Sequence, residues 1–402
     1  MKGGAEMAVP PLFTCPISLD LFRDPVTLCT GLTYDRYHIE KWLAAGNLTC
    51  PVTMQKLDDL SIVPNRTLRH LINQWLQSST QIQQVCVELT DADPLFDSMK
   101  QVIESDESTL KNRLQVLEKI EYLFQEDPFS NSCLIRLDFF GLLLELALGN
   151  AKNLHIQESL ILVEKSLICA LKLMPFSEVV GLNILKKVSK FEGFIHLFEQ
   201  GSSCIKKSLC LIVEAISTRL DNRDLCEKIG KSTKISTAIV HLILQESEEV
   251  AAGIRAMSAL SNLEANRENL VLEGAVQALI SYVSNLEKHE KKLASIAIST
   301  IERLLSVETA KRVVINHPFG VESLVKMVFR VSNHEGSESA VNTLLIICCD
   351  SRIGREKAIV NGIITQLLLL LQSQCNGRTK TKARMLLKLL RSMWSEDSSH
   401  VL

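Results

Sequence analysis

The sequence lacks several features that would assign it quickly to a class of protein. Its 402 residues contain no pair of cysteines spaced as Cys-x-x-Cys, which removes the usual paired ligands of a structural zinc site. The formal net charge is only −2, so the overall charge does not favour binding to nucleic acid. The longest apolar runs, GLLLELALG and GIITQLLLLL, reach about half of the ~20 residues that a transmembrane helix needs. We therefore expect no metal, no nucleic-acid partner and no transmembrane segment.

Signals for secretion are also missing. The N-terminal segment MKGGAEMAVP has no apolar core of the kind found in a signal peptide. The twelve cysteines are scattered without the spacing of a disulfide framework, so we expect free thiols in a reducing compartment. The expected location is the cytoplasm. The short basic stretch NGRTKTKAR leaves the nucleus open as a second compartment, although such stretches occur in many proteins that stay outside it.

Composition divides the chain near residue 80. A chain of 402 residues is too long for one ordinary core. Six of its ten prolines lie in the first 78 residues, whereas the sequence from residue 95 onwards is rich in Leu, Ile, Ser, Lys and Glu. The polar segment between them ends in Asp93-Pro94, a plausible boundary. We predict a small domain over 10–78, a linker over 79–94, a helical array over 95–395 and a tail over 396–402.

The first domain is expected to combine a β-hairpin with two helices. Two segments rich in β-forming residues, 26–28 and 32–34, are joined by a turn that contains Thr-Gly. Asp35 stands where the N-cap of a helix would lie, and a helix over 36–46 follows it. A second helix is expected after Pro64-Asn65, with Thr67 as its N-cap.

Two tetrapeptides of the same type, Cys15-Pro16-Ile17-Ser18 and Cys50-Pro51-Val52-Thr53, occur in this domain. Each has a cysteine followed, three residues later, by a hydroxyl where a zinc-binding chain would place a second cysteine. Because a structural zinc needs four ligands in close pairs, we predict loops held by polar side chains instead of a metal. The candidates for this hydrogen-bond network are Ser18, Asp20, Asp24, Thr53 and Asn65.

Residues 11–77 resemble the U-box, the metal-free relative of the RING finger. The matching segments are CPISLDLFRDPV, TGLTYDR, IEKWL, TCPVT and PNRTLRHLINQW, in the order of a U-box. The resemblance implies a small α+β fold with a shallow apolar groove that binds an E2 ubiquitin-conjugating enzyme. Trp is also the residue type most enriched in binding hot spots. The groove residues would be Ile17, Leu19, Trp42 and Pro51; the alternative is that all four belong to the small core.

One position departs from the pattern. Many U-boxes have Arg or Lys directly after the second tetrapeptide, where the resemblance implies that it bridges conjugating enzyme and ubiquitin. This sequence has Met54 there. Losing charged hydrogen bonds of ~1.5–3 kcal/mol each predicts transfer slower by about tenfold or more. Cys50 has no neighbouring base that would activate it, so we expect direct transfer, with no catalytic residue, no covalent ubiquitin intermediate and no cofactor.

The second part of the chain contains an internal repeat with a period of about 42 residues. The segments NRENLVLEGAVQALISYV, AKRVVINHPFGVESLVKMV and REKAIVNGIITQLLLLL each have a basic start, a short helix, a glycine and a strongly apolar helix. The glycines are Gly274, Gly320 and Gly362. Such triplets of helices are typical of armadillo repeats, which bury their apolar stripes by stacking. Weaker echoes at FFGLLLELALG and FEGFIHLFEQG leave the number of repeats before residue 230 open.

Together the two parts resemble the plant U-box/armadillo ubiquitin ligases. We expect a mainly α protein, in which a small α+β, RING-like and metal-free U-box precedes an armadillo-repeat α-solenoid. The family implies that the U-box binds a ubiquitin-loaded E2 enzyme while the repeats hold a protein substrate, whose lysine attacks. Asn262, in ALSNL, aligns with the groove asparagine of the third helix, and Arg303 would be its equivalent in the next repeat. Both could equally be ordinary solvated positions.

Two other functions stay open at this point. One is a non-catalytic U-box/armadillo adaptor, which Met54 favours. The other is a transport or adhesion scaffold by analogy with armadillo proteins alone, but that leaves the first 78 residues unexplained.

Overall fold

The structure, a computed structural model, divides into two units, Met1–Pro94 and Leu95–Leu402. It describes residues 11–57, 59–69, 71–72, 94–105, 107–126, 133–135, 137–174, 179–217, 222–245, 248–285, 291–329 and 334–397. The predicted linker lies outside these residues, apart from Pro94. The expectation of a mainly α chain with a small α+β unit is confirmed.

The first unit is built on a small antiparallel sheet with the strand order β2-β1-β3. Strand β1 (Pro25–Thr27) pairs with β2 (Thr33–Asp35) on one side and with β3 (Val63–Pro64) on the other. The predicted hairpin is therefore present, with each strand displaced by one residue from its expected position. A short 3₁₀ helix η1 (Pro11–Phe13) precedes the sheet, and helix α1 (Arg36–Ala44) follows β2 directly.

The core of the first unit contains both tetrapeptide cysteines. Cys15, Cys50 and Tyr34 are each 0% exposed, and Ile39 of α1 packs with them. Among the described residues, the buried cluster consists of Cys15, Phe22, Val26, Leu28, Tyr34, Ile39, Cys50, Leu57 and Ile72. Both predicted loops are thus attached to the core through their cysteines.

The second helix of this unit begins one residue earlier than its predicted cap. Residues 66–69 and 71–72 are helical, and Asn65 Oδ1 accepts a hydrogen bond from the Leu68 N–H at 3.0 Å. Asn65, not Thr67, is therefore the N-cap residue, as its amide oxygen reaches the third helical N–H. The prediction of Thr67 was wrong because either residue type can cap a helix, and only the start of the helix decides between them.

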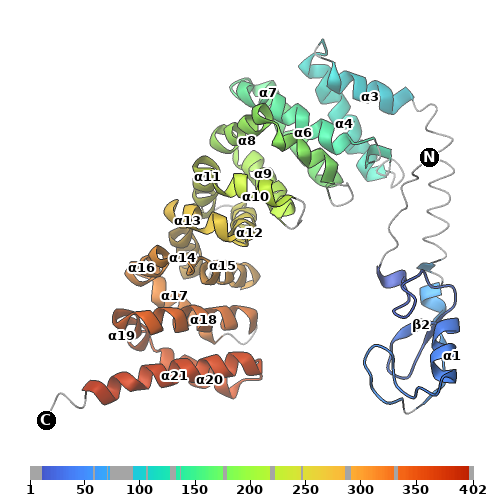
Figure 1. The fold of residues 1–402 in the computed structure, drawn as a ribbon. Helices are drawn as coiled ribbons and strands as arrows, with labels where there is room; N and C mark the ends of the chain where they lie inside the picture. Colours follow the sequence, from blue (N-terminus) through green and yellow to red (C-terminus); the bar gives the residue numbers. More distant parts are fainter. Residues whose placement is uncertain are drawn as a thin grey trace. The chain divides into compact units, whose positions relative to one another are not determined.

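The second unit is a stack of helices (Figure 1). It begins with α3 (Pro94–Glu104) and α4 (Leu110–Glu126), followed by α6 (Phe139–Gly149), η2 (Ala151–Asn153), α7 (Gln157–Leu173), η3 (Val179–Lys186), α8 (Val188–Gln200) and α9 (Ser203–Ser217). Four complete triplets then follow: α10 (Arg223–Gly230), α11 (Thr233–Leu244) and α12 (Val250–Ser261); α13 (Glu264–Leu272), α14 (Ala275–Ser284) and α15 (Lys291–Leu304); α16 (Glu308–Asn316), α17 (Gly320–Val328) and α18 (His334–Asp350); α19 (Arg352–Val360), α20 (Ile363–Gln372) and α21 (Gly377–Asp397).

Equivalent helices of successive repeats pack against one another. The second helices α6, α8, α11, α14, α17 and α20 form one row, and the third helices α7, α9, α12, α15, α18 and α21 form another. The buried apolar side chains form one continuous cluster from Phe96 to Leu390, as expected when each repeat covers the stripe of its neighbour. The early echoes in the sequence are α6 and α8, so the stacking extends well before residue 230. None of the described helices is both long and apolar enough to cross a bilayer.

The three repeat glycines serve two different purposes. Gly274 and Gly362 precede α14 and α20 with φ of +92° and +80°, a left-handed conformation that favours glycine. Gly320 instead starts α17, where a Cβ would lie 2.0 Å from the carbonyl oxygen of Val314. The close approach of the backbones of α16 and α17 therefore requires a residue without a side chain.

We predict that Gly320→Ala destabilises the array by about 3 kcal/mol, at the upper end of the usual cost of overpacking. Gly377→Ala is the matched control, because nothing lies within 4 Å of a Cβ at that position, and it should leave stability unchanged or slightly raise it. Urea unfolding followed by circular dichroism measures both. Equal midpoints for the two variants would contradict the conclusion that the close approach of α16 and α17 requires glycine at position 320.

Candidate functional site

Two loops of the U-box-like unit have the same backbone geometry. We call residues 15–20 loop 1 and residues 50–55 loop 2. In each, the cysteine N–H donates to the carbonyl oxygen of the sixth residue, and the fifth residue donates to the cysteine carbonyl, at 2.8–2.9 Å. The fifth residues, Leu19 and Met54, have φ of 60° and 57°, which costs a non-glycine residue about 1–2 kcal/mol. Both side chains face solvent, 78% and 65% exposed.

The cysteines of both loops bond to two consecutive residues of β2. The Asp35 N–H donates to Cys15 Sγ at 3.2 Å, and Tyr34 Oη shares a hydrogen bond with Cys50 Sγ at 3.0 Å. Thr30 Oγ1 also donates to Cys50 Sγ. In each loop the cysteine sulfur is thus tied to β2 by a hydrogen bond.

The environment of Cys50 changes its acidity. Burial raises the pKa of the thiol, but hydrogen bonds from Thr53, Tyr34 and Thr30 outweigh it and lower the pKa from 9.0 to about 6. Burial, together with the bond to Cys50, raises the pKa of Tyr34. Because the Cys50 side chain is 0% exposed, the sulfur has no open path to a substrate and acts as an acceptor within the fold.

Asp35 holds the chain between loop 1 and β1. Its Oδ2 accepts from the N–H groups of Arg23 and Asp24 at 2.7 and 3.1 Å, and its side chain does not cap α1. Asp35 is thus the N-cap residue of α1, as predicted, but its carboxylate bonds to the N–H groups of Arg23 and Asp24 instead of those of the helix. Asp24 in turn forms ion pairs with Arg36 Nε at 2.6 Å and with Arg69 at 3.3 Å.

The other predicted network residues differ in what they contribute. Ser18 Oγ accepts from the Asp20 N–H at 3.3 Å, and Thr53 Oγ1 accepts from the Gln55 N–H at 3.5 Å. Each hydroxyl therefore supports its own loop. Asp20 takes part through its backbone carbonyl oxygen, while its exposed carboxylate forms no hydrogen bond to any described residue. The prediction that its side chain belongs to the network was wrong for that reason.

Asn65 joins the sheet to the second helix. Its Nδ2 donates to Thr33 Oγ1 at 3.2 Å and lies 3.5 Å from Thr27 Oγ1. The two threonine hydroxyls are 3.0 Å apart across the β1–β2 pair. One amide therefore connects both strands and, through Leu68, the start of the helix.

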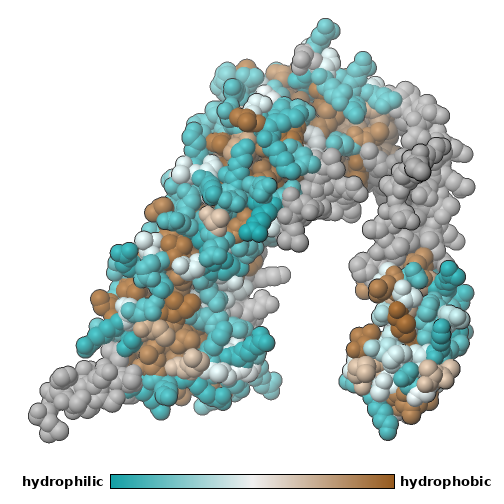
Figure 2. Space-filling view, viewed as in Figure 1, coloured by the Kyte–Doolittle hydropathy of each residue, from teal (hydrophilic) through white to brown (hydrophobic). Residues whose placement is uncertain are grey.

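The four predicted groove residues are not all part of the core. Leu19 is exposed, Pro51 is half-buried, and Ile17 and Trp42 are half-buried against the same cluster of core residues. Trp42 Nε1 donates to the Thr49 carbonyl oxygen at 2.8 Å, which fixes the indole beside loop 2. Figure 2 shows exposed apolar side chains on this unit. We call Ile17, Leu19, Trp42 and Pro51 the loop surface.

The two predicted residues of the array lie in different environments. Asn262 is the exposed C-cap of α12. Arg303 lies inside the last turn of α15, where it donates to Ser261 Oγ at 3.1 Å and to Ser258 Oγ at 2.6 Å. The next helices, α13 and α16, start at Glu264 and Glu308, so the residue equivalent to Asn262 is Ser306, which is exposed as Asn262 is. The sequence alignment with Arg303 was wrong, because this repeat is longer than the spacing from Asn262 to Arg303.

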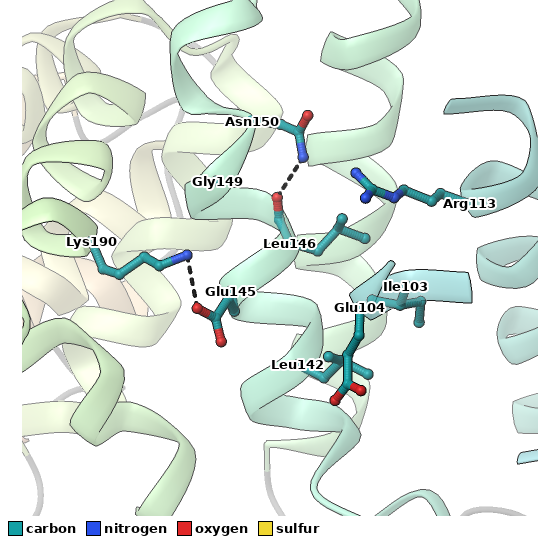
Figure 3. A pocket seen from close by; sticks show the side chains of 9 residues that line it. All are labelled: Ile103, Glu104, Arg113, Leu142, Glu145, Leu146, Gly149, Asn150 and Lys190. Atoms are coloured by element: carbon teal, nitrogen blue, oxygen red, sulfur yellow. Dashed lines mark hydrogen bonds and ion pairs between the residues drawn. The ribbon is translucent and has the colours of Figure 1, made fainter. Parts of the chain in front are cut away.

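A cleft lies near the start of the array, between α3, α4, α6 and α8 (Figure 3). Its charged side chains already have partners within the protein. Lys190 pairs with Glu145 at 2.9 Å, and Arg113 Nη2 donates to the Ser105 carbonyl oxygen at 2.7 Å. With Glu104 also present, the cleft has two cations and two anions, so it favours no charged ligand.

Comparison with known proteins finds a matching family for each of the two units. The family "Plant U-box protein ARM repeat region" matches residues 97–401, and the family "U-box domain" matches residues 9–81. U-box domain-containing protein 26 of Arabidopsis thaliana is 30% identical over 97% of this chain and 94% of its own length. This chain belongs to the plant U-box/armadillo-repeat family.

Two further proteins are similar to this U-box/armadillo protein over most of its length. The protein named E3 ubiquitin-protein ligase PUB23, also from Arabidopsis thaliana, is 28% identical over 99% of this chain and 97% of its own. A crystal structure of SYS-1 covers 81% of this chain and 61% of its own, with 10% identity and a TM-score of 0.51, and this likeness concerns the fold alone.

The U-box contains two functional contacts that sequence reasoning missed, the thiol bonds of Tyr34 and Asp35. Both residues were visible in the segment TGLTYDR, but nothing local indicates that their partners lie 16 and 20 residues away. The retained cysteines were the available signal, since a buried thiol beside polar groups accepts hydrogen bonds.

We predict that Asp35→Ala destabilises the U-box by about 3 kcal/mol, because two part-buried N–H groups, those of Arg23 and Asp24, lose a charged acceptor. Asp20→Ala is the matched control and should change stability by less than about 0.5 kcal/mol. Pulse proteolysis in urea measures the unfolding of this unit in the full-length protein. Similar losses in both variants would contradict the assigned network.

The lowered pKa of Cys50 predicts a pH dependence. Between pH 6 and 9 the unfolded chain binds more protons at this thiol than the folded chain does, so the stability of the U-box should rise with pH. The contribution is complete above pH 9 and is lost as the pH falls through 6. Cys50→Ser should flatten this profile, whereas Cys29→Ser, at an exposed thiol, should keep it. Parallel profiles for wild type and Cys50→Ser would disprove the linkage.

Proposed function

We propose that this protein is an E3 ubiquitin-protein ligase of the non-covalent type. Its U-box binds a ubiquitin-loaded E2 ubiquitin-conjugating enzyme, its armadillo repeats hold the protein substrate, and a substrate lysine attacks the thioester directly. Two relatives bear the name E3 ubiquitin-protein ligase, PUB23 and PUB22, and match 99% and 98% of this chain. The likeness extends over both units, which favours a shared activity over a scaffold built from armadillo repeats alone.

The observation that carries the proposal is the pair of equivalent loops beside an anchored tryptophan. Both loops keep their fifth residue in a strained, left-handed conformation with an exposed apolar side chain. Strain of this kind persists only where the surrounding structure enforces it, and it is concentrated at functional sites. Exposed apolar side chains beside a fixed indole are what a protein partner uses as anchors.

The contribution of the protein to the reaction is positioning. Holding the loaded conjugating enzyme and the substrate on one chain raises the effective concentration of the attacking lysine. Cys50 is buried and hydrogen-bonded to Thr30 and Tyr34, which argues against a ubiquitin thioester on this residue. The proposed mechanism therefore needs no cofactor and no catalytic residue of its own.

Met54 is the feature that favours the second candidate, a non-catalytic adaptor. It lies in the exposed left-handed position of loop 2 and cannot donate the charged hydrogen bonds that Arg or Lys would donate there. We therefore propose a ligase that is slow with common conjugating enzymes or selective for one that does not need this contact.

We also propose the cytoplasm as the site of action, with the nucleus as a second compartment. Most of the basic stretch 376–384 forms the first turns of α21, so these residues belong to a helix of the array rather than to a free basic segment. The cytoplasm is accordingly the preferred location.

We predict that Met54→Arg accelerates discharge of a ubiquitin-loaded conjugating enzyme onto free lysine by about tenfold, because it restores charged hydrogen bonds. Leu19→Arg introduces the same side chain at the equivalent position of loop 1, where it disrupts the loop surface and should slow discharge. Single-turnover gels with the full-length proteins measure both rates. If Met54→Arg does not accelerate discharge, the missing charge at this position does not slow the transfer. If wild type discharges none of several conjugating enzymes, the non-catalytic adaptor is favoured.

A further inference from the structure

The last described repeat, α19 to α21, leaves open a side that the repeats before it bury. Figure 1 shows α20 and α21 at the end of the stack, and no helix of the described residues follows them. The second helices pack in a row, so one side of each is covered by the next. The positions on that side are at most 2% exposed in α14 and α17, where they are Val276, Ile280 and Val283, and Val321, Val325 and Val328. Counted from the start of the helix, the same positions in α20 are Ile364, Leu368 and Leu371. Leu368 is 45% exposed and the other two are half-buried, so this side of α20 is apolar and open.

The third helix of this repeat carries positive charge at positions that α18 buries. Counted from the starts of α18 and α21, Val341 and Cys348 correspond to Arg384 and Arg391. The two residues of α18 are 0% exposed, whereas the two arginines of α21 are exposed. Two lysines share this face of α21, because the four cations are spaced i, i+4, i+8 and i+11. We call these four residues the basic stripe: Lys380, Arg384, Lys388 and Arg391.

The basic stripe faces away from the preceding repeat. Lys382 lies on the side of α21 towards α18, where it meets Glu338 at 3.9 Å. Arg391 follows Lys382 by about two and a half helical turns, so it lies on the opposite side of α21. None of the four stripe cations forms an ion pair or a side-chain hydrogen bond with another described residue. Their charge is therefore available to a partner outside the chain.

The charge of this repeat is almost entirely of one sign. Residues 352–391 contain nine Lys and Arg but a single acidic residue, Glu356, although the whole chain has a formal net charge of −2. Glu356 pairs with Arg352 at 3.1 Å, so it does not neutralise the basic stripe. A repeat that only closes a stack needs a polar outer side, and interspersed charges of both signs serve solubility. Cations alone beside open aliphatic side chains instead indicate a surface for an anionic partner.

We propose that the open side of α20 and α21 docks onto an anionic membrane surface. The basic stripe meets the charged lipid headgroups, and Leu368 enters the boundary between headgroups and acyl chains. A nucleic acid would gain nothing from the open leucine and would need aromatic side chains for stacking, which these positions of α20 and α21 lack. A second copy of this side is disfavoured because it would bring two basic stripes together. The anionic leaflet of cellular membranes faces the cytoplasm, the proposed location, and the inference goes beyond the proposed ligase function.

Flotation of the full-length protein with lipid vesicles tests the proposal. One vesicle preparation contains phosphatidylcholine mixed with phosphatidylserine, and the other contains phosphatidylcholine alone. Wild type should bind the mixed vesicles much more tightly than the neutral ones. Arg384→Gln combined with Arg391→Gln should weaken binding to the mixed vesicles about twentyfold, since each cation near an anionic surface contributes about fivefold. The matched control, Lys111→Gln combined with Lys119→Gln, removes the same charge from exposed positions of α4 and should bind as wild type does.

Leu368→Ser distinguishes a membrane from a nucleic acid. It should weaken binding to the mixed vesicles about fourfold, as expected for the loss of one methylene group from the acyl region. Because Leu368 and both arginines are open to solvent, the variants should keep the thermal midpoint of wild type in circular dichroism. Wild type that ignores the mixed vesicles, or an arginine variant that binds them as tightly as wild type, would overturn the proposal. Binding of duplex DNA in place of vesicles, lost in the arginine variant but intact in Leu368→Ser, would overturn it in favour of a nucleic-acid surface.

Discussion

The hydrogen bonds from Tyr34 and Asp35 to the two loop cysteines determine the shape of the U-box. These residues are neighbours on β2, so one strand holds the sulfur of both Cys50 and Cys15. The two loops share one backbone geometry, and hydroxyl and carboxylate groups supply the remaining bonds. Because the loops are fixed from inside the core, Leu19 and Met54 can be held in strained conformations and exposed to a partner.

Much of this arrangement could be predicted from the sequence, wherever the cause is local. The helix triplets follow from apolar stripes that a single repeat cannot bury, and the repeat glycines marked the starts of α14, α17 and α20. The hairpin was visible from its β-forming residues and turn. The paired tetrapeptides indicated two similar loops, and the order of the motifs gave the family.

Contacts between distant residues could not be predicted in the same way. Asp35 looks like an N-cap in sequence, yet its carboxylate is used by Arg23 and Asp24. The length of the repeat, which makes Ser306 rather than Arg303 the equivalent of Asn262, depends on how the repeats pack. No local signal marks a leucine or a methionine as left-handed, because that conformation is imposed by the whole loop.

The central claim is that loops 1 and 2 form one surface for the conjugating enzyme. Hydrogen exchange of the full-length protein, with and without a ubiquitin-loaded conjugating enzyme, tests it directly. The account predicts added protection in peptides covering residues 14–22 and 48–56, with the outer face of α1 around Tyr37, which is 66% exposed, left unchanged. Protection confined to α1, or found in only one of the two loops, would contradict it.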